Sequence, residues 1–113
     1  MNTEHLDNLT ALLERVLPEL AATRALSFGN VFGAVGGYID DTIFVSCGTF
    51  GVALRLPPDV LAGVLAEEGV HRLRYFPKGH IKKEYAVLPS WILEDNDHLR
   101  RLVESSVDFI DGL

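Results

Sequence analysis

The sequence predicts a single α+β domain in which N-terminal and C-terminal helices pack on a mostly antiparallel five-stranded sheet. Three observations lead to this prediction. Apolar residues recur at helical spacing near both ends, short apolar segments separated by turn residues fill the middle, and no linker, repeat or low-complexity tract interrupts the 113 residues. We therefore expect one domain over residues 1–113, with one core.

The first helix is expected over residues 3–17, capped by Asn2 or Thr3. Its apolar residues are spaced three and four apart and form one stripe, made of Leu6, Leu9, Leu13, Val16 and Leu17. Pro18 has no N–H to donate and its ring collides with the preceding turn. A break near Leu17 follows, with a kink or a fresh helical turn beginning at the proline.

Glycines punctuate residues 28–37, a pattern that resembles a phosphate-binding loop. A P-loop requires Lys-Ser/Thr after its glycines, and a dinucleotide site requires Gly-x-Gly-x-x-Gly; neither pattern occurs. We interpret the segment as an opening strand whose glycines serve packing and turns. The turn residues Asp40-Asp41 and Gly48-Thr49 then define a three-stranded meander that ends at Leu56, in which Phe50–Leu56 buries one face.

A helix of about three turns is expected to begin at Pro57-Pro58-Asp59 and to end with Gly69 as its cap. The segments 70–76 and 84–88 read as a second hairpin around the loop 77–83. Asp95 or Asn96 caps a final helix, and its inward stripe is Leu99, Leu102, Val103, Phe109 and Ile110.

The composition limits the classes of partner. The net charge is −6 and the pI is about 5.0, which opposes general attraction to nucleic acids. No signal peptide and no apolar run long enough for a membrane helix is present, so we expect a cytoplasmic protein without a membrane partner. The single Cys47 excludes an internal disulfide.

A spaced pattern of turns and aromatic residues resembles the N-terminal domain of the TfoX/Sxy competence regulators of bacteria. The resemblance covers roughly residues 9–110 and rests on Phe32-Gly33, Gly37-Tyr38-Ile39-Asp40, Ile43-Phe44, a strand ending at Leu56, Ala66-Glu-Glu-Gly69, Lys78-Gly79, Tyr85 and Pro89-x-x-Ile-Leu-Glu-Asp95. It implies a compact α+β unit of uncharacterised biochemical role, often followed by a helical C-terminal domain. Since the chain ends at Leu113, we expect the free-standing form.

The sequence departs from the family at its opening and at its first hairpin. Gly29-Asn30-Val31 stand before Phe32-Gly33-Ala34, where a basic pair and Met-Phe-Gly-Gly are usual, and Asp41 replaces a hairpin glycine. We therefore do not expect the family's binding surface around the glycines to be retained.

The residue types that carry chemistry predict no catalytic or metal site. Cys47 lies in an apolar strand with no basic neighbour in sequence, so we expect a buried or half-buried structural thiol. His5, His71, His80 and His98 lack the spacing of a zinc site. The carboxylate pairs at 67–68 and 94–95 suit helix ends. We therefore expect no enzyme activity, no metal and no cofactor.

One concentration of positive charge stands out in this acidic chain, formed by Arg72, Arg74, Lys78, His80, Lys82 and Lys83. Its plainest reading is a solvated hairpin loop whose lysines discourage strand-to-strand aggregation. Our leading functional hypothesis is a non-enzymatic regulatory or interaction domain that contacts a protein partner through this loop, as a monomer or a homodimer.

Two further functions remain open. A small-molecule-binding protein or minor enzyme would use a cleft between the glycine-rich strand and the last helix, lined by Phe32, Tyr38 and Trp91. Weak nucleic-acid binding would use the 78–83 loop, with Tyr75, Phe76 and Tyr85 stacking on bases if these rings are exposed; cross-strand pairing is the plainer role for such aromatics.

Overall fold

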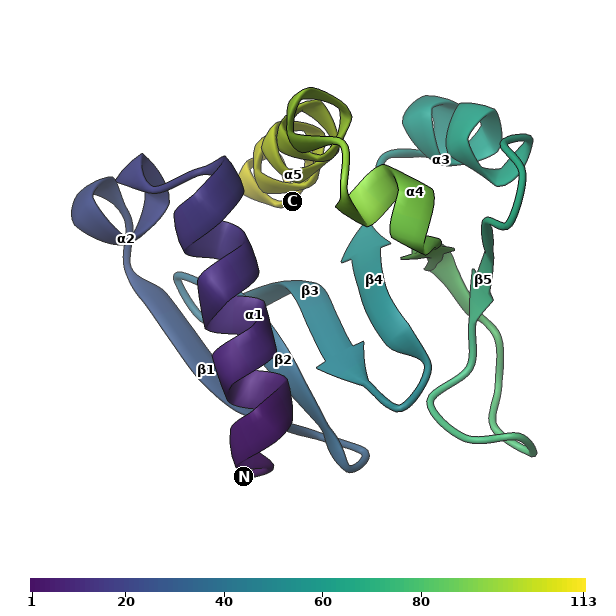
Figure 1. Ribbon diagram of the computed structural model, residues 1–113, viewed down its shortest axis with the longest axis horizontal. Helices are drawn as coiled ribbons and strands as arrows, with labels where there is room; N and C mark the ends of the chain where they lie inside the picture. Colours follow the sequence, from purple (N-terminus) through teal and green to yellow (C-terminus); the bar gives the residue numbers. More distant parts are fainter.

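Six strands form one antiparallel sheet, and five helices complete the domain in the computed structural model, which describes residues 1–113 (Figure 1). The elements in chain order are α1 (Thr3–Val16), α2 (Glu19–Thr23), β1 (Leu26–Val31), β2 (Ala34–Ile39), β3 (Thr42–Gly48), β4 (Gly51–Arg55), α3 (Pro58–Leu65), β5 (His71–Leu73), β6 (Lys82–Leu88), α4 (Ser90–Leu93) and α5 (Asn96–Asp111). The strands lie in the order β1-β2-β3-β4-β6-β5. The predicted α+β class is confirmed, with six strands in place of five.

The additional strand comes from the glycine-rich segment, which is a hairpin and not a single opening strand. β1 and β2 close on the pair Val31 and Ala34, and the two residues between them have left-handed backbones, with φ 47° at Phe32 and 81° at Gly33. This is the two-residue turn that matches the twist of the flanking strands. Such turns ordinarily carry Asn, Asp or Gly at the first position, so a phenylalanine there conceals the turn from sequence analysis.

The next turn has the same geometry. Asp40 and Asp41 have φ 49° and 65°, and they join β2 to β3 as predicted. Aspartate tolerates the left-handed region better than most residues, which explains why no glycine is needed.

The helix boundaries at both ends of the chain follow the capping residues. The Asn2 side chain accepts a hydrogen bond from the His5 N–H at 2.9 Å, and Asp95 accepts one from the His98 N–H at 3.1 Å. α1 ends at Val16, and α2 begins directly after Pro18. The predicted caps and the predicted break near Leu17 are confirmed.

The middle of the second half differs from the prediction. α3 ends at Leu65 instead of running to Gly69, because Ala66 and Glu67 turn more tightly and bond to the carbonyls three residues back. Gly69 has φ 81° and serves the reversal into β5. β5 is only three residues long, and β6 begins at Lys82, because the β5–β6 register shifts after Arg72.

A β-bulge increases the number of core residues in β3. The β2–β3 register shifts so that Phe44 has no partner between Ile43 and Val45. Phe44 and Val45 are both fully buried as a result. The Ser106 hydroxyl of α5 donates to the Phe44 carbonyl at 3.0 Å, which satisfies a buried acceptor at the bulge.

The two faces of the sheet are covered differently. All five helices contribute to the main core of 24 buried residues against one face, where α1 and α5 cross the strands (Figure 1). The other face carries a cluster of four buried residues, Ala53, Leu73, Tyr85 and Val87, against which the partly buried Ile43, Phe50 and Tyr75 pack. Phe109, predicted to face inward, is half-buried beneath the Arg55 guanidinium. None of the helices combines the length and apolar character needed to span a bilayer.

Candidate functional site

The one thiol of the chain is buried. Cys47 lies in β3 with 4% of its surface exposed. Burial raises the pKa of the thiol, and the negative charge of Glu4 raises it further. The prediction that Cys47 is buried is confirmed, and a reactive thiolate needs the opposite conditions.

The histidines do not form a metal centre. Nε2 of His98 lies 3.1 Å and 3.3 Å from the two carboxylate oxygens of Glu67, and its ring lies 6.1 Å from that of Trp91. This contact joins α5 to the turn after α3. No group of three or more His, Cys, Asp or Glu side chains is arranged to hold a metal ion.

The glycines of β2 serve side-chain packing, as predicted. A Cβ on Gly37 would lie 2.7 Å from a methyl carbon of Val45, and a Cβ on Gly36 would lie 3.0 Å from the Tyr38 hydroxyl. A side chain at either position would require these neighbours to shift.

A surface that sequence analysis only partly anticipated lies where the turn between β1 and β2 meets the segment between β5 and β6. We call it the aromatic–basic surface and define it by Phe32, Tyr75, Phe76, Lys78 and Lys82. The Phe32 ring centroid lies 5.3 Å from that of Tyr75 and 6.0 Å from that of Phe76. The Lys82 Nζ lies 5.4 Å from the centre of the Phe32 ring, within range of a cation–π contact.

Phe32 is both exposed and strained. Of its surface, 63% is exposed to solvent, and its φ of 47° places a bulky residue in the left-handed region. A left-handed backbone costs about 1–2 kcal/mol for a residue with a Cβ. Phe76 beside it is 50% exposed. A strained, exposed aromatic residue is the kind of feature that clusters at functional sites.

The base of this surface is held by side-chain contacts. Tyr75 donates from its hydroxyl to the Ser46 Oγ at 3.3 Å and packs edge-on against Phe50, with ring centroids 5.6 Å apart. Burial raises the pKa of Tyr75 and, more strongly, that of Tyr85. Both phenols therefore stay protonated and neutral at physiological pH.

The segment between β5 and β6 is braced from within. Arg74 donates to the Gly79 carbonyl at 3.0 Å, and the Gly79 N–H donates to the Phe76 carbonyl at 2.8 Å. The aromatic and basic side chains are thus carried on a turn with its own hydrogen bonds.

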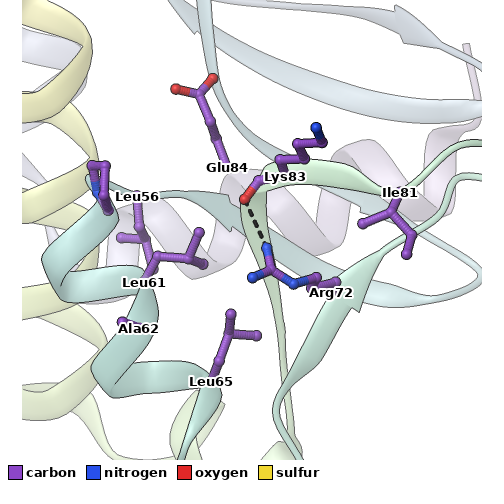
Figure 2. Close-up of a pocket in the computed structure, with 9 residues that line it drawn as sticks. Leu56, Leu61, Ala62, Leu65, Arg72, Ile81, Lys83 and Glu84 are labelled. Atoms are coloured by element: carbon purple, nitrogen blue, oxygen red, sulfur yellow. Dashed lines mark hydrogen bonds between the residues drawn. The ribbon is translucent and has the colours of Figure 1, made fainter.

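A second feature is an apolar groove of about 570 Å³ between α3 and the β5–β6 pair (Figure 2). Leu56, Leu61 and Leu65 form its wall, and Arg72, Lys83 and Glu84 lie along the strand side. Arg72 donates to the Lys83 carbonyl at 3.0 Å.

The sequence matches the TfoX N-terminal domain family over residues 19–110, which is most of the chain and runs from α2 to the end of α5. The chain belongs to the TfoX N-terminal domain family. No curated protein matches the sequence. The match begins later than the resemblance expected from residue 9, so α1 lies outside the matched range although Leu9 is fully buried in the core.

In this TfoX N-terminal domain the six predicted basic residues divide between the two features. Lys78 and Lys82 belong to the aromatic–basic surface, and His80 is exposed on the same segment. Arg72 and Lys83 line the groove. Arg74 belongs to neither feature, because it donates to the Gly79 carbonyl within the segment between β5 and β6.

The three residues proposed for a ligand cleft are not brought together. Phe32 packs with Tyr75 at one end of the sheet, and Tyr38 lies over Gly36 on the face away from the helices. Trp91 lies on α4 near the opposite end, where its indole N–H donates to the Glu68 carbonyl at 2.8 Å (Figure 1).

The sequence did not show which aromatic residues are exposed or that the α3 leucines line a groove. Of the three aromatics considered for base stacking, only Phe76 is exposed, because Tyr75 is half-buried and Tyr85 is 8% exposed. The sequence shows only the helical spacing of the α3 leucines, and that spacing does not indicate that they line a groove. A bulky residue directly before Gly33 was the one available signal for a strained turn.

Proposed function

We propose that this TfoX N-terminal domain is a non-enzymatic regulatory module of the cytoplasm that binds an acidic protein partner through the aromatic–basic surface. The observation that carries the proposal is Phe32, which a left-handed backbone holds 63% exposed at the tip of the first hairpin. Aromatic residues, phenylalanine among them, are enriched at the cores of protein interfaces.

The charge distribution favours an acidic partner. Arg24, Arg55 and Arg100 each pair with a carboxylate of the domain. Lys78 and Lys82 form no ion pair, although the chain carries 16 acidic residues. Lys82 lies 5.4 Å from the exposed Phe32 ring, and Lys78 follows Phe76 by two residues. These unpaired cations match a partner that presents carboxylates around an apolar contact.

The internal hydrogen bonds of the surface also support the proposal. The Tyr75 hydroxyl bond to Ser46 and the Arg74 bond to the Gly79 carbonyl fix the segment beneath the exposed rings. A surface that is ordered before binding loses less conformational entropy when a partner docks.

The absence of activity remains part of the proposal. It is supported by the placement of the most nucleophilic side chain, Cys47, which is buried and has a raised thiol pKa.

The test uses capture of partners from cell extract by the immobilised full chain, followed by mass spectrometry. Phe32→Asn keeps a residue that tolerates the left-handed turn but removes the ring. We expect this variant to bind the captured partner with about thirtyfold lower affinity, corresponding to about 2 kcal/mol for a hot-spot residue. Lys78→Glu with Lys82→Glu is expected to abolish capture by repulsion.

A charge-matched control separates the surface from the net charge. Ala21→Glu, Ala22→Glu and Arg101→Glu together change the net charge by the same amount at exposed positions of α2 and α5. This variant should capture the partner as the unmodified domain does. Equal capture by the correctly folded Phe32 and lysine variants would refute the proposal.

Nuclease treatment of the extract tests the nucleic-acid alternative. Binding that disappears with nuclease, or that falls steeply with salt, would assign the surface to nucleic acid instead.

A further inference from the structure

We propose that the groove between α3 and the β5–β6 pair binds a small amphipathic carboxylate, with its apolar chain along α3 and its carboxylate on Arg72. This site goes beyond the proposed partner contact and does not depend on it. It also differs from the cleft that the sequence suggested, because none of Phe32, Tyr38 and Trp91 lines it.

The size and wall of the groove suit an apolar chain. Its volume of about 570 Å³ lies within the range of about 300–1,000 Å³ typical of small-molecule sites. Its apolar lining runs along one side of α3 and continues across to Ile81, which is 42% exposed (Figure 2). A ligand chain would cover the accessible part of this lining, at Pro58, Ala62, Leu65 and Ile81, and remove those carbon atoms from water.

The irregular edge of the sheet leaves part of this wall open, since Leu65 is half-buried whereas Leu56 and Leu61 lie buried at the base of the groove. β5 is only three residues long, and its register with β6 shifts between Arg72 and Leu73. α3 has eight residues and ends before it reaches β5. Leu61 and Val64 of α3 pack into the core with residues of β6, and the groove lies between Leu65 and the strand residues Arg72 and Lys83.

Arg72 supplies the recognition of an anion. Figure 2 shows its guanidinium directed from β5 toward Leu61 and Leu65, and one of its nitrogens donates to the Lys83 carbonyl at 3.0 Å. Arg72 forms no ion pair with any carboxylate of the domain. The remaining N–H groups of its planar fork suit the two oxygens of a carboxylate.

The carboxylate that lines the groove is already neutralised. Glu84 Oε1 lies 3.1 Å from Nε and 3.0 Å from Nη2 of Arg55. Lys83 adds a second cation, although in Figure 2 its side chain extends away from α3. The net local charge thus favours an anion, and Arg72 is the cation nearest the apolar wall.

The test is a titration of the full-length domain with decanoate below its micellar concentration, followed by methyl NMR shifts and calorimetry. We expect saturable binding with shifts at the leucine methyls of α3. Decanol has the same chain without the charge and should bind about tenfold or more weakly, the usual effect of a charge-assisted hydrogen bond. Butanoate has the charge without the chain and should not bind measurably.

Three variants localise the site. Arg72→Gln should weaken decanoate binding by about tenfold or more, while Arg101→Gln, a matched change on the exposed side of α5, should leave it unchanged. Ala62→Phe places a ring in the groove from an exposed helix position and should abolish binding without lowering the unfolding temperature.

The outcomes are decisive in either direction. Absence of saturable decanoate binding, equal affinity in Arg72→Gln, or shifts confined to other parts of the domain would each overturn the proposal. Tighter binding of a short apolar peptide with a free C-terminal carboxylate would reassign the ligand class. Phe32→Asn should bind decanoate normally, so the fate of this site is independent of that of the aromatic–basic surface.

Discussion

Replacing Phe32 by glycine and by alanine separates the strain of its backbone from the contacts of its ring. Both variants remove the Phe32 ring and its contacts with Tyr75 and Phe76. They differ in whether a Cβ must occupy the left-handed region at φ 47°. The difference between the two free energies of unfolding therefore measures the strain.

The expected magnitude follows from two opposing effects. A Cβ in the left-handed region costs about 1–2 kcal/mol, which favours glycine at this position. Glycine loses more conformational entropy on folding, which favours alanine by about 0.5–1 kcal/mol. We therefore expect Phe32→Gly to be more stable than Phe32→Ala by about 0.5–1 kcal/mol, or about 2–4 °C in Tm.

The assay is urea unfolding of the two variants, with thermal unfolding as a second measure. Phe76 provides the matched control, since it is half-exposed in the same cluster but has no left-handed backbone. There the order should reverse, with Phe76→Ala more stable than Phe76→Gly. If Phe32→Ala equals or exceeds Phe32→Gly, the turn is not strained and the reasoning that singles out Phe32 is refuted.

Three further predictions concern packing, a buried hydrogen bond and pH. Gly37→Ala should lower the free energy of unfolding by about 1–3 kcal/mol, because its Cβ would lie 2.7 Å from a β3 methyl group. Gly63→Ala is the control: the space around Gly63 in α3 is open, so this variant should raise the free energy of unfolding by about 0.5–1 kcal/mol in the same urea assay. Ser106→Ala should cost about 1–3 kcal/mol by leaving the Phe44 carbonyl unpaired, and a loss in urea unfolding below about 0.3 kcal/mol would contradict that role for the bond. Burial raises the pKa of Tyr85, so the folded state keeps a proton that the unfolded chain loses near pH 10, and stability should fall as the pH rises above about 10. Tyr85→Phe should flatten this alkaline decline in urea titrations at about pH 8 and pH 11; an unchanged slope would assign the decline to other groups.

The parts of the fold that depend on local sequence were predictable. Asn2 and Asp95 cap helices because their side-chain oxygens reach nearby N–H groups, and Pro18 separates two helices because it has no N–H. Cys47 was predicted buried from its apolar strand neighbours. Each of these inferences uses residues only a few positions apart.

The candidate sites could not be predicted because they join distant segments. Phe32 meets Tyr75 only after the β1–β2 turn and the β5–β6 segment fold to one end of the sheet. The groove exists because the β5–β6 register shifts after Arg72, and hydrophobic periodicity carries no information about where a register shifts.

The sequence alone therefore determined the class of the domain, the capped starts of its first and last helices, the break at Pro18 and most of its strands, since hydrophobic spacing and capping act within one or two turns of chain. The tertiary structure decided the sixth strand, the bulge at Phe44 and the neighbours of Phe32 and Arg72. These features arise from strand pairing and long-range packing, whose free energy depends on residues that the chain brings together only when it folds.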